Sequence, residues 1–342
     1  MTSYLSELGS ACAIGLGTFP FASPFREVSP DEMDATVTSF LEAGGKYIDT
    51  APTYAFGEVE RRLGRILARF PRDQYFINTS CGYVRDGDGY RVSARAEDVV
   101  ADAAESLSRL NLDFFDSYIL HIPDPATPLE ETAAALRQLK ESGIARRLGL
   151  SNVTPAQLRA YADEIEVDVV QQRFSLINRS MDQAFIEACY GSGACVVAYQ
   201  VIERGLLTTT FGRSGVDIPV YDLRSKKPEF AEDRRSIVRR WVHESLAPIA
   251  ENYSATVEAI AVAWACQQEQ VGIVQCGAST PQQVDMWMAA SALLGNRQLL
   301  TDIERAYETL TGIVIQHGFT SVRDLLGLEG VDPLQGLSAS GK

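Results

Sequence analysis

Short apolar segments alternate with longer amphipathic ones along most of the chain. The short segments hold four to six residues, and several are apolar throughout, as is typical of strands buried in a parallel sheet. Seven of these segments predict strands, at residues 47–50, 75–79, 115–120, 147–150, 167–171, 194–199 and 272–275.

The longer segments carry apolar residues at intervals of three or four, which predicts amphipathic helices. One helix is expected to begin after Ser29, to bury Met33 and Val37, and to stop at Gly44-Gly45. Further helices are expected at residues 96–110, 129–139 and 155–162, and one from Thr280-Pro281, where proline takes the first helical position. Strand followed by helix, about eight times over roughly 290 residues, predicts an α/β fold, the (β/α)8 TIM barrel.

A doubly wound open sheet is the alternative to the barrel. No G-x-G-x-x-G motif follows the first predicted strand, which disfavours the dinucleotide-binding form of that fold. No low-complexity linker divides the 342 residues, so we expect one barrel domain over 1–342, with its core at about 10–315 and a polar tail at about 328–342. Residues 213–235 are polar and predict a long surface loop.

The balance of acidic and basic residues argues against some classes of binding partner. The chain has 31 Lys and Arg against 45 Asp and Glu, a formal net charge of −14. This balance argues against a nucleic-acid interface and against docking on an anionic membrane. The N-terminus lacks the basic and apolar regions of a signal peptide, and no run of about 18 apolar residues occurs, so neither secretion nor a membrane span is expected. Six cysteines without C-x-x-C spacing predict reduced, buried thiols in a cytoplasmic protein.

Polar residues follow most of the predicted strands. In a barrel the reactive groups gather at the carboxyl ends of the strands. The candidates there include Asp49, Ser80, His121 and Gln171. His121 is one of three histidines in the chain, and histidines scattered in this way do not predict a metal site. A lone histidine after a strand is more often structural, so His121 is a catalytic candidate only in combination with its neighbours.

Several segments together resemble the aldo-keto reductase family. Residues 48–54 (IDTAPTY), followed by Gly57-Glu58 and Arg62-Leu63-Gly64, resemble its first strand-end motif. Residues 13–18 resemble its opening hairpin and first turn, and Leu120-His121 resembles its catalytic histidine motif. The resemblance runs in order from about residue 10 to about residue 315. It implies NAD(P)H-dependent reduction of aldehydes and ketones, or the reverse oxidation of alcohols.

The catalytic tetrad of that family consists of Asp, Tyr, Lys and His. Asp49, Tyr54 and His121 match it, and the resemblance makes Tyr54 the general acid toward the carbonyl oxygen and His121 the group that orients the carbonyl. Ser80 stands in place of the lysine, which in the family pairs with the aspartate and lowers the pKa of the tyrosine. An unperturbed tyrosine titrates near pH 10, so the substitution removes an electrostatic partner of the reaction.

Arg173 offers one substitute for the missing lysine. It lies two residues after Gln171 on the same predicted strand, so the two side chains face the same side. Arg173 therefore either reaches Asp49 or Tyr54 in place of the lysine, or recognises an anionic substrate, or pairs with a carboxylate of the barrel.

The resemblance also implies a dinucleotide site. Ser151, Asn152 and Gln171 would hold the nicotinamide carboxamide, and Tyr199 would stack under its ring. The other expected contacts are Gly17, Thr18, Gly205, Leu206, Gly277, Ser279 and Gln283. The cofactor is expected to be NADPH or NADH. The preference for NADP is weakened because Ser279, Trp287 and Thr210 stand where the family often has Arg, Asn and Lys.

Three functions remain open at this point. The first is an NAD(P)H-dependent oxidoreductase with a modified tetrad, acting on a small molecule. The second is a non-redox dehydratase, lyase or isomerase that uses Asp49, Tyr54 and His121 as acid and base. The third is a non-catalytic dinucleotide-binding regulatory protein. Residues 82–91 either bind a polar or sugar-like substrate or form a solvated loop, and the expected assembly is a monomer or a small homo-oligomer.

Overall fold

A computed structural model describes residue 8, residues 13–210 and residues 218–329. Within this part of the chain, eight parallel strands close into a barrel in the order β1-β10-β9-β8-β7-β6-β3-β2. They are Ala13–Gly17 (β1), Tyr47–Asp49 (β2), Phe76–Cys81 (β3), Ser117–Leu120 (β6), Leu148–Ser151 (β7), Val169–Arg173 (β8), Cys195–Tyr199 (β9) and Val271–Gly277 (β10). The predicted (β/α)8 barrel is confirmed, and the open-sheet alternative is wrong.

Strand β1 is the segment that the resemblance presents as an opening hairpin and turn. Ala13 pairs with Ile273 of β10, and Leu16 pairs with Ile48 of β2, so β1 closes the barrel. The expectation of a hairpin is therefore wrong for residues 13–17. The glycines at positions 15 and 17 make this strand resemble a turn in the sequence. The packing requires Gly15, because a Cβ at this position would lie 2.6 Å from Cδ1 of Tyr47.

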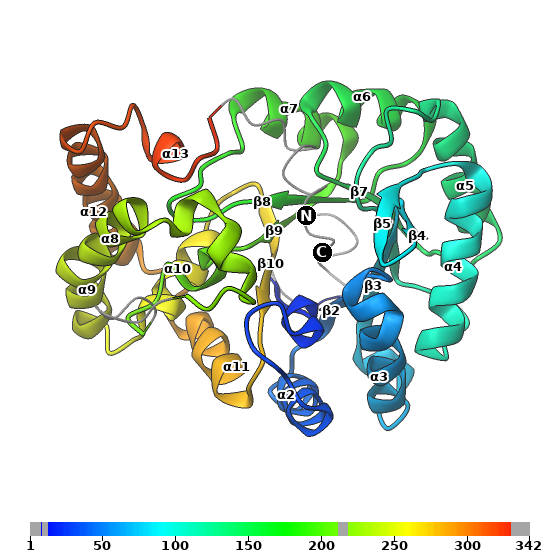
Figure 1. Cartoon of the computed structure of the whole chain (residues 1–342), viewed down its shortest axis with the longest axis horizontal. Coiled ribbons are helices and arrows are strands. Elements are labelled where there is room, and N and C mark those ends of the chain that lie inside the picture. The colour runs from blue at the N-terminus through cyan, green and yellow to red at the C-terminus, as the bar shows by residue number, and fades with distance from the viewer. Residues whose placement is uncertain (1–7, 9–12, 211–217, 330–342) are drawn as a thin grey trace.

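Helices surround the strands, as Figure 1 shows. Those that follow barrel strands are α2 (Pro30–Glu42), α3 (Glu58–Leu67), α4 (Ala96–Leu110), α5 (Leu129–Glu141), α6 (Pro155–Glu164), α7 (Gln183–Ser192), α10 (Val257–Cys266) and α11 (Pro281–Met288). Each helix from α2 to α7 packs against the next one, and α10 packs against α11, which packs against α2. The helices predicted after Ser29, at 96–110, 129–139 and 155–162, and from Pro281 are all present.

A second group of helices packs together at one side of the barrel (Figure 1). It consists of α8 (Glu232–Trp241), a π-helical turn at Val242–Leu246, α9 (Ala247–Asn252), α12 (Arg297–Gln316) and α13 (Val322–Leu325). Two tryptophans anchor α12. Nε1 of Trp241 donates to the Ala306 carbonyl at 2.6 Å, and Nε1 of Trp264 donates to Oε1 of Glu304 at 2.8 Å.

The short 3-10 helices are η1 (Phe19–Ala22), η2 (Tyr54–Gly57), η3 (Arg72–Gln74), η4 (Glu203–Gly205), η5 (Leu223–Lys226), η6 (Pro228–Phe230) and η8 (Ala289–Leu293). The expectation of a polar surface loop at 213–235 is wrong where η5, η6 and the start of α8 lie, because Glu229 and Phe230 are buried there. Residues 211–217 and the expected tail from residue 330 onward lie outside the described residues.

Helix α2 begins with a reciprocal capping box. The Glu32 backbone N–H donates to Oγ of Ser29 at 3.2 Å, and the Ser29 backbone N–H donates to Oε2 of Glu32 at 2.9 Å. Pro30 takes the first helical position. This local geometry fixes the Glu32 carboxylate beside the loop that follows β1.

Residues 83–92 form an antiparallel hairpin, which includes most of the segment 82–91. Its strands are Tyr83–Asp86 (β4) and Gly89–Val92 (β5). The hairpin leans on the segment after β2, since the Tyr90 hydroxyl donates to the Pro52 carbonyl at 3.4 Å and the Tyr90 ring stacks on Phe56.

Several broader properties can be read from the described residues. Five of the six cysteines are buried thiols, as predicted: Cys81, Cys189, Cys195, Cys266 and Cys276. The sixth, Cys12, lies outside the described residues. Among the described helices, none has the length and apolar character needed to cross a bilayer. No cluster of three or more His, Cys, Asp or Glu side chains in this part of the chain is arranged to hold a metal ion.

Candidate functional site

The polar residues predicted at the strand ends come together at the carboxyl end of the barrel. Asp49 ends β2, Ser80 lies on β3, His121 follows β6 and Gln171 lies on β8. Their contacts separate them into two groups, one around Asp49 and one formed by Ser80 and His121.

Asp49 is held by three neutral amides, which we call the amide cage: Asn78, Gln171 and Gln275. The side-chain nitrogens of Asn78 and Gln171 each donate to Oδ1 of Asp49 at 2.6 Å, and that of Gln275 donates to Oδ2 at 2.7 Å. Burial raises the pKa of Asp49 to about 6, because the three amide donors offset only part of the lost solvation. Within the described residues, no arginine or lysine forms an ion pair with this carboxylate.

Asn78 and Gln275 were not predicted as site residues. Asn78 lies two positions before Ser80 on β3, and the two-residue alternation of a strand turns both side chains to the same face. The hydroxyl of Ser117 donates to Oδ1 of Asn78 at 2.7 Å, which orients the Asn78 amide toward Asp49. The alternation along β3 was therefore a signal that could have found Asn78.

Ser80 and His121 form a hydrogen-bonded pair. Oγ of Ser80 lies 3.1 Å from Nδ1 of His121, and the Tyr83 ring meets the imidazole edge-on. Burial lowers the pKa of His121 to about 4, so the imidazole is neutral at physiological pH. With the Ser80 hydroxyl as donor, Nδ1 is an acceptor and the ring proton sits on Nε2.

Tyr54 follows β2 at the start of η2, in a strained turn. Ala55 and Phe56 both have left-handed backbone angles, with φ of 49° and 53°. Such strain in consecutive non-glycine residues is typical of functional sites. Burial raises the pKa of Tyr54 well above its usual value, and the charge of Asp49 adds to this effect. The Tyr54 hydroxyl is therefore protonated.

Arg173 does not take the place of the missing lysine. Its guanidinium is bonded to Glu203 and lies 3.3 Å from Glu229, which also accepts from Arg204 at 2.9 Å. We call these four side chains the arginine–glutamate network. The hypothesis that Arg173 reaches Asp49 or Tyr54 is wrong, because two buried carboxylates hold it. Pairing with barrel carboxylates is the alternative that the structure has.

The residues expected around the nicotinamide lie close together. The Tyr199 hydroxyl donates to Oδ1 of Asn152 at 2.7 Å, and Nδ2 of Asn152 lies 3.0 Å from Oγ of Ser151 and 2.9 Å from the His121 carbonyl. Gln171 is committed to the amide cage. These contacts join the expected carboxamide-binding residues to the Ser80–His121 pair.

Several buried polar atoms at the carboxyl ends of the strands have no hydrogen-bond partner among the described residues. They include Oγ1 of Thr18 after β1, Oγ1 of Thr50 after β2, Oε1 of Gln172 on β8 and Oε1 of Gln200 after β9. Buried polar atoms are nearly always hydrogen-bonded, so such atoms at the carboxyl end of a barrel are consistent with a polar ligand there, although other unpartnered atoms, such as Nε of Arg72 and Oδ2 of Asp102, lie elsewhere. The carboxyl end of the barrel therefore fits the dinucleotide that the sequence analysis expects.

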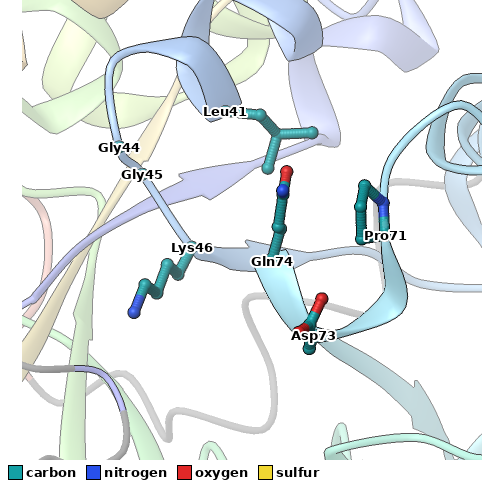
Figure 2. A pocket seen from close by; sticks show the side chains of 7 residues that line it. All are labelled: Leu41, Gly44, Gly45, Lys46, Pro71, Asp73 and Gln74. Atoms are coloured by element: carbon teal, nitrogen blue, oxygen red, sulfur yellow. The ribbon is translucent and has the colours of Figure 1, made fainter.

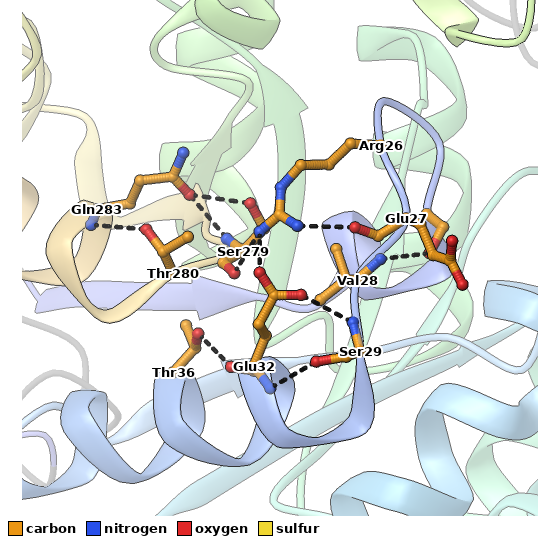
Figure 3. Close-up of polar contacts among 10 residues, drawn as sticks. Arg26, Glu27, Val28, Ser29, Glu32, Thr36, Ser279, Thr280 and Gln283 are labelled. Atoms are coloured by element: carbon orange, nitrogen blue, oxygen red, sulfur yellow. Dashed lines mark hydrogen bonds and ion pairs between the residues drawn. The ribbon is translucent and has the colours of Figure 1, made fainter.

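The expected phosphate-side residues lie after the last two barrel strands. Gly205 and Leu206 belong to η4 and its C-cap, and Gly277 ends β10. Figure 3 shows the Ser279 backbone N–H donating to Oε1 of Gln283 at 2.7 Å. Trp287 is 2% exposed, so it packs in the core rather than against an adenine.

A pocket with a volume of about 480 Å³ opens at the opposite end of the barrel. It lies beside the segments that lead into β2 and β3, and Figure 2 shows Leu41, Pro71 and Gln74 around it. Its other lining residues are Gly44, Gly45, Lys46 and Asp73. None of the predicted site residues lines it, and barrel enzymes act at the carboxyl end, so we do not assign it to catalysis.

Comparison with known proteins gives a consistent family. The model of the aldo/keto reductase family matches residues 13–308. The NADH-specific methylglyoxal reductase of Escherichia coli is 31% identical over 293 residues, covering 81% of this chain and 89% of that protein. The D-threo-aldose 1-dehydrogenase of a Pseudomonas species is 27% identical, covering 80% and 87%.

Solved structures agree with the sequence relatives. The glycerol dehydrogenase of Gluconobacter oxydans superposes with a TM-score of 0.77 at 27% identity, covering 89% of this chain and 92% of that one. An aldo-keto reductase of Bacillus halodurans superposes with a TM-score of 0.70 at 21% identity, a likeness of fold.

Proposed function

Because the chain belongs to the aldo-keto reductase family, we propose that it interconverts a carbonyl group and an alcohol on a small polar or sugar-like substrate, with NAD(P)H as cofactor. Family membership supports an oxidoreductase of carbonyl groups. The names of the relatives refer to methylglyoxal, an aldose and glycerol, which are all small oxygenated molecules. The observation that carries the proposal is the Ser80–His121 hydrogen bond at the carboxyl end of the barrel, the end at which Tyr54 follows β2.

In this reaction the side chains of the protein stabilise the negative charge that develops on the carbonyl oxygen. When bound, the nicotinamide supplies or accepts the hydride. As hydride reaches the carbonyl carbon, the oxygen becomes an alkoxide and needs donors within hydrogen-bond reach. We assign proton transfer to this oxygen to the Tyr54 hydroxyl, and a hydrogen bond to the same oxygen to Nε2–H of His121. A phenol is a stronger acid than an aliphatic alcohol, so the proton moves from Tyr54 to the alkoxide and tyrosinate regains one from water.

Ser80 contributes a neutral hydroxyl group to this site. A lysine at this position would lower the pKa of Tyr54. We assign the Ser80 hydroxyl as donor to Nδ1 of His121, which leaves the imidazole proton on Nε2. Two neutral donors, from Tyr54 and His121, then face the oxygen. Asp49 has both of its oxygens occupied by the amide cage.

A non-redox acid–base function is the second candidate, and Asp49 favours it. A carboxyl with a pKa of about 6 can exchange protons near neutral pH. The amide cage counts against this role, because three N–H donors favour the deprotonated form and occupy the oxygens that a substrate would need.

The test begins with binding and continues with turnover. The full chain is titrated with NADH and with NADPH, followed by tryptophan fluorescence, and then assayed with methylglyoxal and a panel of aldoses. Tyr54→Phe should lower kcat/KM by about 10²–10⁴-fold and leave the cofactor Kd unchanged. The matched control is Tyr75→Phe, a buried tyrosine directly before β3 at the other end of the barrel, which should keep wild-type turnover.

Each failure points to a different function. If neither cofactor binds up to millimolar concentration, hydride transfer is excluded and acid–base chemistry becomes the leading function. If cofactor binds but no carbonyl is reduced, and Ser80→Lys does not restore reduction, the non-catalytic regulatory function is favoured.

A further inference from the structure

We propose that the Arg26–Glu32 ion pair selects the dinucleotide, and that it selects NADH over NADPH because the Glu32 carboxylate receives the hydroxyls of the adenosine ribose. The inference rests on the proposed function, since it concerns the cofactor of the same site. Neither residue was anticipated from the sequence.

The ion pair lies beside the loop that phosphate groups use in this fold. Barrels commonly bind phosphates with the loops after the seventh and eighth strands, which here are β9 and β10. Nη2 of Arg26 donates to the Ser279 carbonyl at 3.0 Å, directly after β10, and lies 2.9 Å from Oε1 of Glu32 (Figure 3). Arg26 therefore bridges the loop before α2 and the loop before α11.

The charge balance at this position disfavours a 2′-phosphate. Arg26 is the single cation in residues 18–29 and 278–280, and it is already bonded to Glu32 and to two backbone carbonyls. Glu27, Asp31 and Glu32 follow Arg26 along the chain. Arg224, whose guanidinium lies 4.9 Å from the Phe25 ring of the same loop, is itself paired with Asp222 at 2.6 Å. A phosphate dianion would have to displace Glu32 from Arg26 and would then face an uncompensated carboxylate.

The same arrangement suits a ribose with free hydroxyls. Oε1 of Glu32 accepts from Arg26 and Oε2 accepts from the Ser29 backbone, so each oxygen keeps a second lone pair. The Arg26 and Glu32 side chains are 42% and 40% exposed, which leaves the carboxylate open to a ligand at the rim. The hydrogen bond from Arg26 also lowers the pKa of Glu32, which keeps it ionised. In other dinucleotide folds, a carboxylate that accepts from the ribose 2′-hydroxyl distinguishes NAD from NADP.

The experiment measures cofactor binding alone, without a carbonyl substrate. The full chain and its variants are titrated with NADH and NADPH, and the two Kd values are compared. The wild type should bind NADH about tenfold more tightly or better. Glu32→Gln should reduce this preference about tenfold or more, the size expected for one hydrogen bond to a charged group. Glutamine also serves in a capping box, so α2 should keep its start.

Two further variants separate a local effect from a general one. Asp31→Asn removes the same charge from the same helical turn and should leave the preference within about twofold, since screened surface charges contribute little. Arg26→Gln should weaken NADH binding at least as much as NADPH binding. A selective loss of NADPH binding would show that Arg26 holds the 2′-phosphate, and would overturn the inference.

The remaining outcomes are also decisive. Tighter binding of NADPH by the wild type overturns the inference and leaves the proposed function standing, as does an equal response of Glu32→Gln and Asp31→Asn. Absence of binding for both cofactors overturns the proposed function and the inference together.

Discussion

Asp49 and Glu203 are both buried at the carboxyl end of the barrel, with 3% and 1% of their surfaces exposed. Asp49 is surrounded by three neutral amides, whereas Glu203 is bonded to Arg173 and to the Ser175 hydroxyl. The two carboxylates thus lie in one region of the molecule, but only one of them has a counter-charge.

Amide dipoles and an arginine stabilise a buried, charged carboxylate to different extents. Three short N–H donors orient a carboxylate and replace part of its hydration, yet burial still raises the pKa of Asp49 to about 6. An arginine supplies a full opposite charge as well as geometry. The arginine–glutamate network is therefore a fixed part of the framework, and the amide cage holds a group whose protonation can change.

The largest expected effect comes from breaking the arginine–glutamate network. Arg173→Met removes the Glu203 ion pair with Arg173 and one of the two ion pairs of Glu229, and should lower the free energy of unfolding by about 3–5 kcal/mol in urea denaturation at pH 7. Arg65→Met is the control, because Arg65 is 71% exposed in its pair with Glu58 and should change stability by less than about 1 kcal/mol. Similar losses in both variants would show that burial of the network matters little.

A cation introduced beside the amide cage should give Asp49 a counter-charge, as the arginine–glutamate network gives Glu203. Ser80→Lys should lower the pKa values of Tyr54 and Asp49 by about 1–3 units. In the pH profile of carbonyl reduction, the alkaline limb should move down by the same amount, while the wild type stays level to about pH 10. Ser80→Met has similar length without charge, so an identical shift in that variant would contradict the electrostatic explanation.

The pH dependence of stability tests the protonation of Asp49 and His121. The pKa of Asp49 is raised to about 6, so its charged form destabilises the fold above that pH, and acid relieves the penalty down to its unfolded value. The pKa of His121 is lowered to about 4, so its stabilising effect is complete above its unfolded value and is lost as the pH falls toward 4. The two effects oppose each other between about pH 4 and 6, each by up to about 3 kcal/mol at roughly 1.4 kcal/mol per pKa unit.

The variants separate these opposed contributions. From pH 7 to pH 4.5, Asp49→Asn should lose stability more steeply than the wild type, and His121→Gln should lose it less steeply. Urea midpoints across this range provide the measurement. Parallel curves for the wild type and both variants would show that neither group titrates in this window.

The smallest expected effect is that of Asp49→Asn on stability at pH 7. The substitution removes a charge whose burial costs up to about 3 kcal/mol. The asparagine side chain, however, accepts from the amide cage with one oxygen instead of two, so the opposed effects should leave the free energy of unfolding within about 1 kcal/mol of the wild type. A loss comparable to that of Arg173→Met would mean that the amide cage neutralises Asp49 as fully as arginine neutralises Glu203.

Elements defined by local sequence could be predicted well. Helix α4 has the bounds expected from its apolar spacing, and α2 begins after Ser29 because capping and proline act within one turn. Strand β1 was missed because Gly15 and Gly17 resemble a turn, and only its position between β10 and β2 explains them. Local patterns therefore locate elements but not every partner.

The site residues that the sequence predicts are those that lie in recognisable motifs. Asp49, Tyr54, Ser80 and His121 were named from strand ends and from the family resemblance. Asn78 and Gln275 carry no such motif, and the partners of Arg173 lie 30 and 56 positions away along the chain. Arg26 and Glu32 become candidate site residues only because the loop before α2 contacts the loop after β10. Apart from Asn78, which the alternation along β3 indicates, these groups depend on tertiary neighbours that no single segment reveals.

The closure of the barrel by β1 has a consequence for synthesis on the ribosome. Ala13 pairs with Ile273, which emerges 260 residues later. At about 5–20 residues per second, the edge of β1 that faces β10 waits roughly ten seconds to a minute for its partner, although β2 emerges soon after β1. An open strand edge of this kind can pair with strands of other nascent chains. Its two glycines weaken such premature pairing, so the chain can be completed before its first strand is committed.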